Sequence, residues 1–225
     1  MKQMKFVFVI AAVVMVPFVT LHADETQRTG KRADDFLLGI IMDSDFGDII
    51  DIPYDTYITS STLSLVGLND VCIRFEPGTQ VLLDDIYNNV LELNNCSNVR
   101  IQGGFFRHVD PLEEYDCHGG VISIYNCSNI TIDNCTLSGC GANGILISGS
   151  ENTEIRHCLI EDNSFTAFYF ISFNDLEIDH CVIRNNGRLF YSSTRHELVN
   201  LRMSNNFIHD NNTYFCDYEI PGLRD

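Results

Sequence analysis

The sequence of 225 residues contains no tryptophan and few basic residues. Lysine and arginine together number 14 against 31 aspartate and glutamate residues, so the formal net charge is −17. A nucleic-acid-binding protein needs clustered positive charge to displace counterions, and this sequence therefore excludes nucleic acid as a partner. A surface this acidic also repels anionic glycans unless a cation bridges the two.

Long apolar runs are absent apart from one near the N-terminus. Residues 1–23 combine Lys2 and Lys5 with an apolar run at 6–19 and a final small residue, Ala23, which is the order of a secretory signal. The run is shorter than the roughly 20 residues that a membrane-spanning helix needs, although an N-terminal anchor is the alternative. We predict cleavage after Ala23, a polar unstructured leader at 24–32, and a secreted protein, extracellular or periplasmic, with no membrane span.

Helical periodicity is missing from the central part of the chain, which instead repeats itself. Ile132 opens I-D-N-C-T-L, Ile155 opens I-R-H-C-L-I and Ile178 opens I-D-H-C-V-I, each 23 residues apart, and Met203 opens M-S-N-N-F-I after 25 more. Each unit reads as short alternating strands separated by Asn, Ser, Gly and Asp turns. One unit cannot bury its apolar face, but units stacked at about 4.8 Å bury it continuously.

The repeat therefore predicts an all-β, single-stranded parallel β-helix of about six or seven coils. A leucine-rich repeat, the rival architecture, would need a helix or L-x-x-L-x-L spacing in every unit, and neither is present. Before the first strand, residues 34–45 place Phe36, Leu37, Ile40 and Ile41 at helical spacing, with Asp34 available as an N-cap.

Two segments resemble the pectate-lyase-like superfamily of right-handed parallel β-helices. Gly144 to Asn163 matches its coil pattern G-I-x-I-x-x-S-x-N-x-x-I-x-x-C-x-I-x-x-N, and Gly47 to Tyr57 is similar to its first strand, G-D-x-I-x-I-P-x-G-x-Y, with Asp55 in place of the second glycine. The resemblance covers about residues 45–212. It implies a right-handed helix occupying residues 33–225, with the 34–45 segment as a short cap helix over its N-terminal end.

The nine cysteines contain no C-x-x-C pair, so a zinc or dithiol redox site has little support. Cys135, Cys158 and Cys181 share one position of successive coils, followed by Asn206, and Cys96 and Cys127 share another, followed by Ser150 and Phe173. Both positions accept small or apolar side chains, which predicts buried free thiols, with disulfides as the alternative in an exported protein. Cys117 and Cys140, in turns one coil apart, are the best candidates for a bridge.

Five asparagines lie in N-x-S/T triplets: Asn95, Asn126, Asn129, Asn134 and Asn211. They are glycosylation acceptors in a secreted eukaryotic chain. Their periodic placement is better explained by hydrogen bonding in turns.

Charged residues recur at outward strand positions. One column reads Thr131, Glu154, Glu177 and Arg202, and its neighbour reads Asp133, Arg156, Asp179 and Ser204. One interpretation is a series of surface ion pairs, each contributing little stability. The other is a cation site, with Asp133, Glu154, Glu177 and Asp179 as candidate ligands for Ca²⁺. Calcium-dependent lyases of the superfamily that the sequence resembles use an arginine as the base. The resemblance therefore makes Arg156 the candidate base.

Further candidates lie in the turns before the strands that begin G-I-x-I and on the outward faces of neighbouring strands. Asp116 and His118 form a candidate acid–base pair on one turn, with a solvated loop as the alternative. Outward-facing Tyr125 and Tyr169, two coils apart along the same groove, are candidates for stacking on sugar rings, although tyrosines are common on exposed sheet faces. The polygalacturonase branch carries several catalytic aspartates before these strands, whereas only Asp116 matches here. Inverting hydrolysis needs two carboxyl groups about 6.5–9.5 Å apart, so that activity is not supported.

These observations predict a secreted, carbohydrate-interacting β-helix protein, acting as a monomer on a polysaccharide or cell-surface glycan, related to polysaccharide-degrading enzymes but without a recognisable catalytic motif. Two alternatives stay open. One is a Ca²⁺-dependent polysaccharide lyase, and the other is a non-catalytic surface or adhesive module.

Overall fold

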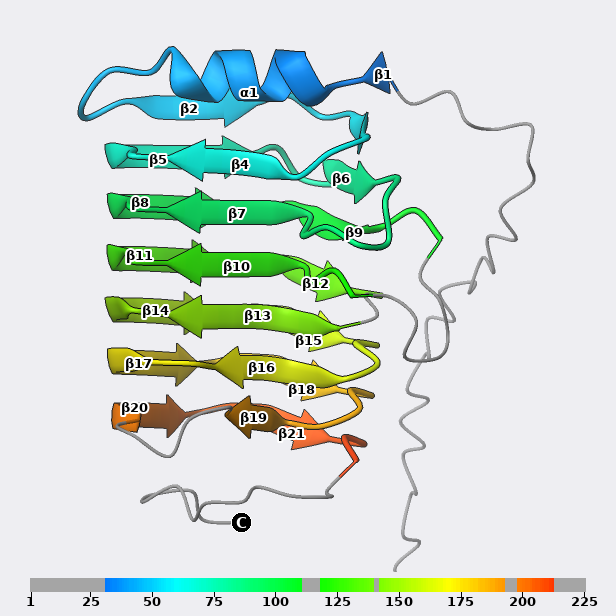
Figure 1. The fold of residues 1–225 in the computed structure, drawn as a ribbon, viewed down its shortest axis with the longest axis vertical. Coiled ribbons are helices and arrows are strands. Elements are labelled where there is room, and N and C mark those ends of the chain that lie inside the picture. The colour runs from blue at the N-terminus through cyan, green and yellow to red at the C-terminus, as the bar shows by residue number, and fades with distance from the viewer. Residues whose placement is uncertain (1–30, 111–117, 140–141, 193–197, 213–225) are drawn as a thin grey trace, which may run out of the picture.

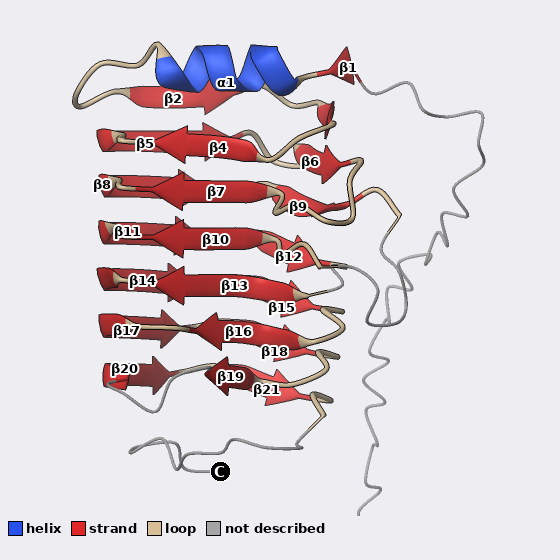
Figure 2. Ribbon diagram, in the orientation of Figure 1, coloured by secondary structure: helices blue, strands red, loops and turns tan. Residues whose placement is uncertain are grey.

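A computed structural model of the chain describes residues 31–110, 118–139, 142–192 and 198–212. Their strands stack into a solenoid whose coils contribute to three parallel sheets, named A, B and C here (Figure 1). Strands dominate the fold, with one short helix near the N-terminal end (Figure 2). The all-β solenoid has about 6 turns and is right-handed, as the repeat and the resemblance predicted.

Each coil runs through the sheets in the order B, A, C. Sheet B contains β2 (Ile49–Ile52), β5 (Asn69–Phe75), β8 (Ser97–Gln102), β11 (Ser128–Asp133), β14 (Ser150–Arg156), β17 (Phe173–Asp179) and β20 (Leu198–Ser204). Sheet A contains β1 (Lys31–Arg32), β3 (Thr56–Thr59), β6 (Gln80–Leu83), β9 (Phe105–His108), β12 (Thr136–Ser138), β15 (Leu159–Glu161), β18 (Val182–Arg184) and β21 (Phe207–His209). Sheet C contains β4 (Leu63–Val66), β7 (Leu91–Asn94), β10 (Ile122–Tyr125), β13 (Asn143–Ser148), β16 (Thr166–Phe170) and β19 (Phe190–Ser192).

The parallel register places the repeat motifs directly on top of one another. Ile132 pairs with Ile155, and Ile155 pairs with Ile178. All three side chains are completely buried. Because successive side chains of a strand point to opposite faces, every second residue enters one continuous core, and the residues between them form columns on the outside.

The corners between strands depend on residues with a left-handed backbone. Between sheets B and A, the corner residues Asn134, His157, His180 and Asn205 have φ of +55, +53, +51 and +55°. Asparagine, aspartate and histidine tolerate this conformation better than other side chains with a Cβ atom. Four of the five N-x-S/T asparagines also have positive φ, namely Asn95, Asn126, Asn129 and Asn134. These four asparagines thus occupy left-handed backbone positions. Among the five, the side chain of Asn129 donates to Asn98, and that of Asn211 donates to the carbonyls of Ile183 and His209.

The cysteines of the repeat are free thiols inside the solenoid, which confirms the prediction for Cys96, Cys127, Cys135, Cys158 and Cys181. The Cys135 Sγ donates to the carbonyl of Gly103 at 3.1 Å, and the Cys158 Sγ donates to that of Arg156 at 3.2 Å. These thiols therefore satisfy backbone carbonyls at the corner. Cys117 and Cys140, the candidate disulfide, lie outside the described residues.

The cap helix α1 spans Asp34–Met42, three residues shorter than predicted, and lies across the first coil (Figure 1). Leu37 and Ile41 are completely buried, whereas Phe36 is 45% exposed and stacks on Tyr57. Asp34 is not the N-cap, which corrects that expectation. Its carboxylate instead accepts hydrogen bonds from the backbone N–H groups of Ser60 and Ser61, and so attaches the helix to the turn between β3 and β4.

Strand β1 occupies the last two residues of the segment expected to be an unstructured leader. Lys31 pairs with Tyr57 and Arg32 with Ile58, so sheet A begins two residues before the predicted domain boundary. The rest of the leader and the signal segment lie outside the described residues. Within the described part of the chain, no helix is long and apolar enough to cross a membrane.

Candidate functional sites on the solenoid surface

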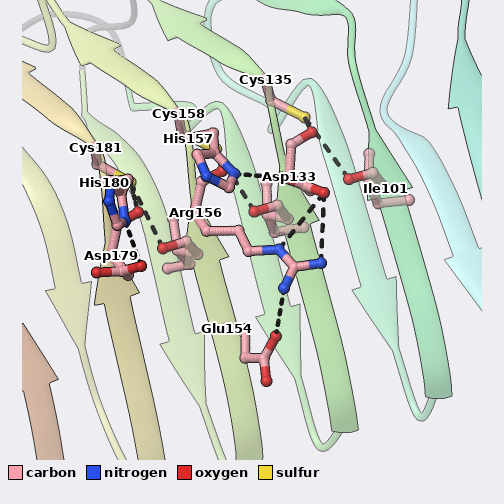
Figure 3. Close-up of polar contacts among 12 residues, drawn as sticks. Ile101, Asp133, Cys135, Glu154, Arg156, His157, Cys158, Asp179, His180 and Cys181 are labelled. Atoms are coloured by element: carbon pink, nitrogen blue, oxygen red, sulfur yellow. Dashed lines mark hydrogen bonds and ion pairs between the residues drawn. The ribbon is translucent and has the colours of Figure 1, made fainter. Parts of the chain in front are cut away.

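Arg156, the candidate base, lies on the outward face of sheet B between two acidic side chains (Figure 3). Its guanidinium is 3.5 Å from Asp133 Oδ2 on β11 and 3.5 Å from Glu154 Oε2 on its own strand. Asp133 also contacts the Nδ1 of His157 through its other oxygen, at 3.0 Å. Arg156 is therefore engaged in ion pairs on both sides.

The next coils repeat this pairing of charges. Arg202 on β20 is 3.3 Å from Glu177 Oε2 and 4.0 Å from Asp175 Oδ1. A shallow groove of about 300 Å³ runs over this part of sheet B and is lined by Asn129, Thr131, Glu154, Asp175, Glu177 and Arg202. The structure thus places Glu154 and Glu177 beside one another, each with an arginine.

Asp179 is held in a different set of contacts. It accepts hydrogen bonds from Ser204 at 2.6 Å and from Asn205 at 2.9 Å, and it contacts His180 Nδ1. These interactions, with Ser204 first and His180 next, hold the pKa of Asp179 well below its usual range. The four candidate calcium ligands are therefore all engaged: Asp133 and Glu154 share Arg156, Glu177 pairs with Arg202, and Asp179 has the contacts just described. Within the described residues no three His, Cys, Asp or Glu side chains are grouped to hold a metal ion.

Two histidines at the corner beside Asp133 and Asp179 were missed by the sequence interpretation. His157 and His180 follow β14 and β17, and their ring centroids lie 5.5 Å apart (Figure 3). The signal was present in the repeat, because I-R-H-C and I-D-H-C place both histidines at the same position of successive coils.

Only one member of the predicted acid–base pair, His118, lies within the described residues. Asp116 lies outside the described residues, and His118 is exposed and stacks on Tyr87, with ring centroids 6.0 Å apart. A catalytic role for Asp116 and His118 stays a prediction.

Sheet C carries the candidate sugar-stacking residues on its outward face. Tyr125 on β10 pairs with Ser148 of β13, whereas Tyr169 on β16 pairs with Leu146 of β13. The two tyrosines are thus two coils apart, as expected, but two positions apart along the strand direction. They lie in different columns and are not in contact.

Tyr169 instead belongs to an aromatic cluster that we define as Phe165, Tyr169, Arg188 and Tyr191. The rings of Tyr169 and Tyr191 are 5.2 Å apart on adjacent coils, and Phe165 packs edge-on against Tyr191 at 5.0 Å. The Arg188 guanidinium lies over the rings of Phe165 and Tyr191, at 5.1 and 5.7 Å from their centroids. All four side chains are partly exposed.

Tyr191 could have been found from the sequence. Phe168-Tyr169-Phe170 and Phe190-Tyr191-Ser192 repeat at 22 residues, one shorter than the 23-residue spacing of the two preceding coils. The structure pairs Tyr169 of β16 with Tyr191 of β19 in the parallel register.

These features define a class of protein, the parallel β-solenoids with polar and aromatic columns on the outside. The chain matches the family model described as "Right handed beta helix region" over residues 79–219, more than half of its length, and belongs to that family. No match is found among curated proteins.

One similar solved structure is the crystal structure of a "putative glycosyl hydrolase" from Parabacteroides merdae ATCC 43184. The likeness has a TM-score of 0.59 at 15% sequence identity and covers 72% of this chain and 81% of that one. At this identity the likeness concerns the fold.

Proposed function

We propose that this chain is a secreted, carbohydrate-interacting β-helix protein that binds a glycan on the outward face of sheet C through the aromatic cluster. The observation that carries the proposal is the pairing of Tyr169 with Tyr191, whose partly exposed rings lie 5.2 Å apart on adjacent coils. Aromatic rings on a rigid sheet provide flat, apolar surfaces against which the C–H faces of sugar rings pack.

Arg188 strengthens this site in two ways. Its guanidinium lies over Phe165 and Tyr191, so the cation–π contacts restrain both rings before a ligand arrives. Among the described residues, Arg188 forms no ion pair with a carboxylate. Its N–H groups can donate to sugar hydroxyl or carboxylate oxygens.

Tyr125 extends the proposed site toward the N-terminal end of sheet C. Relative to Tyr169 it lies two coils away and two residues along the strand, or about 10 Å by about 7 Å. An oligosaccharide that contacts both tyrosines would have to run obliquely across the sheet. Short sugars would reach only the aromatic cluster.

The name of the Parabacteroides merdae protein supports a carbohydrate ligand as a class, because glycosyl hydrolases act on sugar polymers. The proposal assigns no catalytic residue. A calcium-dependent lyase would require a free Arg156 beside a grouped set of carboxylates, whereas Arg156 is paired with Asp133 and Glu154. The non-catalytic surface module is the other alternative.

Affinity gel electrophoresis against neutral and acidic polysaccharides tests the proposal. We expect at least one polysaccharide to retard the protein, and Tyr169→Ala and Tyr191→Ala each to weaken retardation by about tenfold, from the loss of one stacking surface. Tyr54→Ala is the matched control, because Tyr54 is 68% exposed and lies between β2 and β3 of the first coil, several coils away from β16 and β19.

Equal weakening by Tyr54→Ala, or retardation unchanged in both cluster variants, would overturn the binding site. The same samples are assayed for ultraviolet-absorbing unsaturated ends with and without a chelator. Such products, lost with the chelator and in Arg156→Ala, would establish the lyase instead. Absence of both retardation and products across the panel would leave the surface module.

A further inference from the structure

We propose that His157 and His180 together bind one divalent transition-metal ion of the Zn²⁺, Ni²⁺ and Cu²⁺ class. This site lies at the corner between sheets B and A, whereas the aromatic cluster lies on sheet C, so the inference does not depend on the proposed function. It arises from two histidines that lie one coil apart, each with its Nδ1 against a carboxylate: His157 against Asp133 of the preceding coil, and His180 against the adjacent Asp179 (Figure 3).

The backbone fixes the positions of both histidines. Each follows a strand of sheet B and has a left-handed backbone, with φ of +53° at His157 and +51° at His180. The backbone N–H of His157 donates to the carbonyl of Asp179 in the next coil, at 3.1 Å. The two side chains therefore leave the solenoid from equivalent corners, and rigid strands fix their separation.

Carboxylates fix the orientation of both imidazole rings. His157 Nδ1 lies 3.0 Å from Asp133 Oδ1, and His180 Nδ1 contacts Asp179 Oδ2. A carboxylate only accepts hydrogen bonds, so each Nδ1 carries the proton and each Nε2 presents its lone pair when the ring is neutral. This is the carboxylate–histidine arrangement that supports metal-bound histidines in proteins and increases their basicity.

The spacing of the rings suits a shared ion. With metal–nitrogen bonds of about 2.0–2.1 Å, two imidazoles on one ion have centroids no more than about 6.5 Å apart. The observed centroid distance is 5.5 Å, with a tilt of 35° between the rings. The side chains are 56 and 54% exposed, so an ion can reach them from solvent and complete its coordination with water.

The chemistry of the pair selects the class of ion. Imidazole nitrogen suits zinc, nickel and copper, whereas calcium and magnesium prefer oxygen ligands. The nearby carboxylates are already engaged, Asp133 with Arg156 and His157, and Asp179 with Ser204, Asn205 and His180. They are therefore better placed to orient the histidines than to coordinate a calcium ion.

The site is tested by isothermal titration of Zn²⁺ and Ni²⁺ into the untagged protein, with His157→Asn and His180→Asn as the variants. Asparagine occupies the same corner in the neighbouring coils as Asn134 and Asn205, with φ of +55° at both, so the backbone accepts it. We expect one ion per chain in the unmodified protein and at least a tenfold loss of affinity in either variant. Ca²⁺ and Mg²⁺ should give no binding heat at the same concentrations.

His209→Asn is the matched control. His209 Nδ1 contacts Asp210 at 2.6 Å, which reproduces the carboxylate–histidine pair, but its ring packs against Phe207 and not against another histidine. Metal affinity that is unchanged in His209→Asn and lost in both other variants supports the shared site. Unchanged affinity in either His157→Asn or His180→Asn, or equal losses in all three variants, would overturn it. Circular dichroism confirms that each variant is folded.

Discussion

The side chain of Asn163 donates from Nδ2 to Asn186 Oδ1 at 2.8 Å, one coil away inside the solenoid. Asn186 in turn donates to Asn211 Oδ1 at 2.9 Å, and Asn211 donates to the carbonyl of Ile183 at 2.8 Å. This asparagine ladder satisfies backbone groups at the corner after sheet A. Asn186 is the central member, because its side chain bonds both neighbouring asparagines and two backbone carbonyls.

Asn186→Ala is expected to lower the free energy of unfolding by about 2–3 kcal/mol, because it removes a buried amide that bonds the carbonyls of Ile160 and Arg184. Urea denaturation followed by far-ultraviolet circular dichroism measures the change. Asn94→Ala, at a half-buried outward position of β7, should change the stability by no more than about 0.5 kcal/mol. Equal midpoints for the two variants would contradict the role of the ladder.

The cysteines should differ sharply in their reactivity. Cys158 and Cys181 are buried, and a hydrogen bond between thiols of adjacent coils together with burial raises the pKa of each. The thiolate is the form that reacts with iodoacetamide, and a buried thiol with a raised pKa rarely ionises. Iodoacetamide should therefore label Cys158 and Cys181 only after unfolding. Cys72, which is half-buried, should react in the folded protein. Peptide mass spectrometry after timed alkylation checks this, and rapid labelling of Cys158 at native conditions would contradict it.

Asp34 should contribute stability that disappears in acid. Burial raises its pKa, but hydrogen bonds from Ser60 and Ser61 outweigh burial and hold the pKa below its usual value. A group with a lowered pKa stabilises the fold above its unfolded-state pKa of about 3.9, and this contribution is lost as the pH falls through the folded-state value.

Asp34→Asn should therefore lower the urea midpoint at pH 7, and its difference from the unmodified protein should shrink below pH 4. The control is Asp35→Asn, which removes the same charge from the same helical turn at an exposed position. A difference that stays constant between pH 7 and pH 3 would rule out the carboxylate as its source.

Two glycines should respond to alanine in opposite directions. A Cβ atom at Gly187 would lie 2.0 Å from the carbonyl oxygen of Ser164, so Gly187→Ala should destabilise the solenoid by about 3 kcal/mol through displacement of adjacent coils. At Gly39 in α1 a Cβ atom would meet nothing within 4 Å beyond the helix's own backbone and its chain neighbours, and Gly39→Ala should stabilise the protein by about 0.5–1 kcal/mol. Thermal denaturation of the pair measures both effects, and a shift of the same sign in both would refute the steric argument.

The repeat length determined most of the fold without a structure. A period of 23 residues means that residues 132, 155 and 178 share a column, because each coil returns the chain to the same position one strand further along the solenoid. The buried positions of Cys135, Cys158 and Cys181 follow from the same arithmetic, as do the outward columns that contain Arg156 and Tyr169. The apolar spacing also predicted the cap helix, but it did not show that Phe36 is partly exposed while Leu37 and Ile41 are buried.

The partners of each side chain were decided only by the tertiary structure. Arg156 has a neighbouring carboxylate in the coil on either side, Asp133 and Asp179, at the same strand spacing. It lies against Asp133 and Glu154, because His180, Ser204 and Asn205 occupy Asp179. Side-chain torsions and hydrogen-bond competition between columns are not specified by the repeat. The sequence by itself thus determined which residues share a column, and the packed solenoid decided which of them meet, including the pairs Tyr169–Tyr191 and His157–His180.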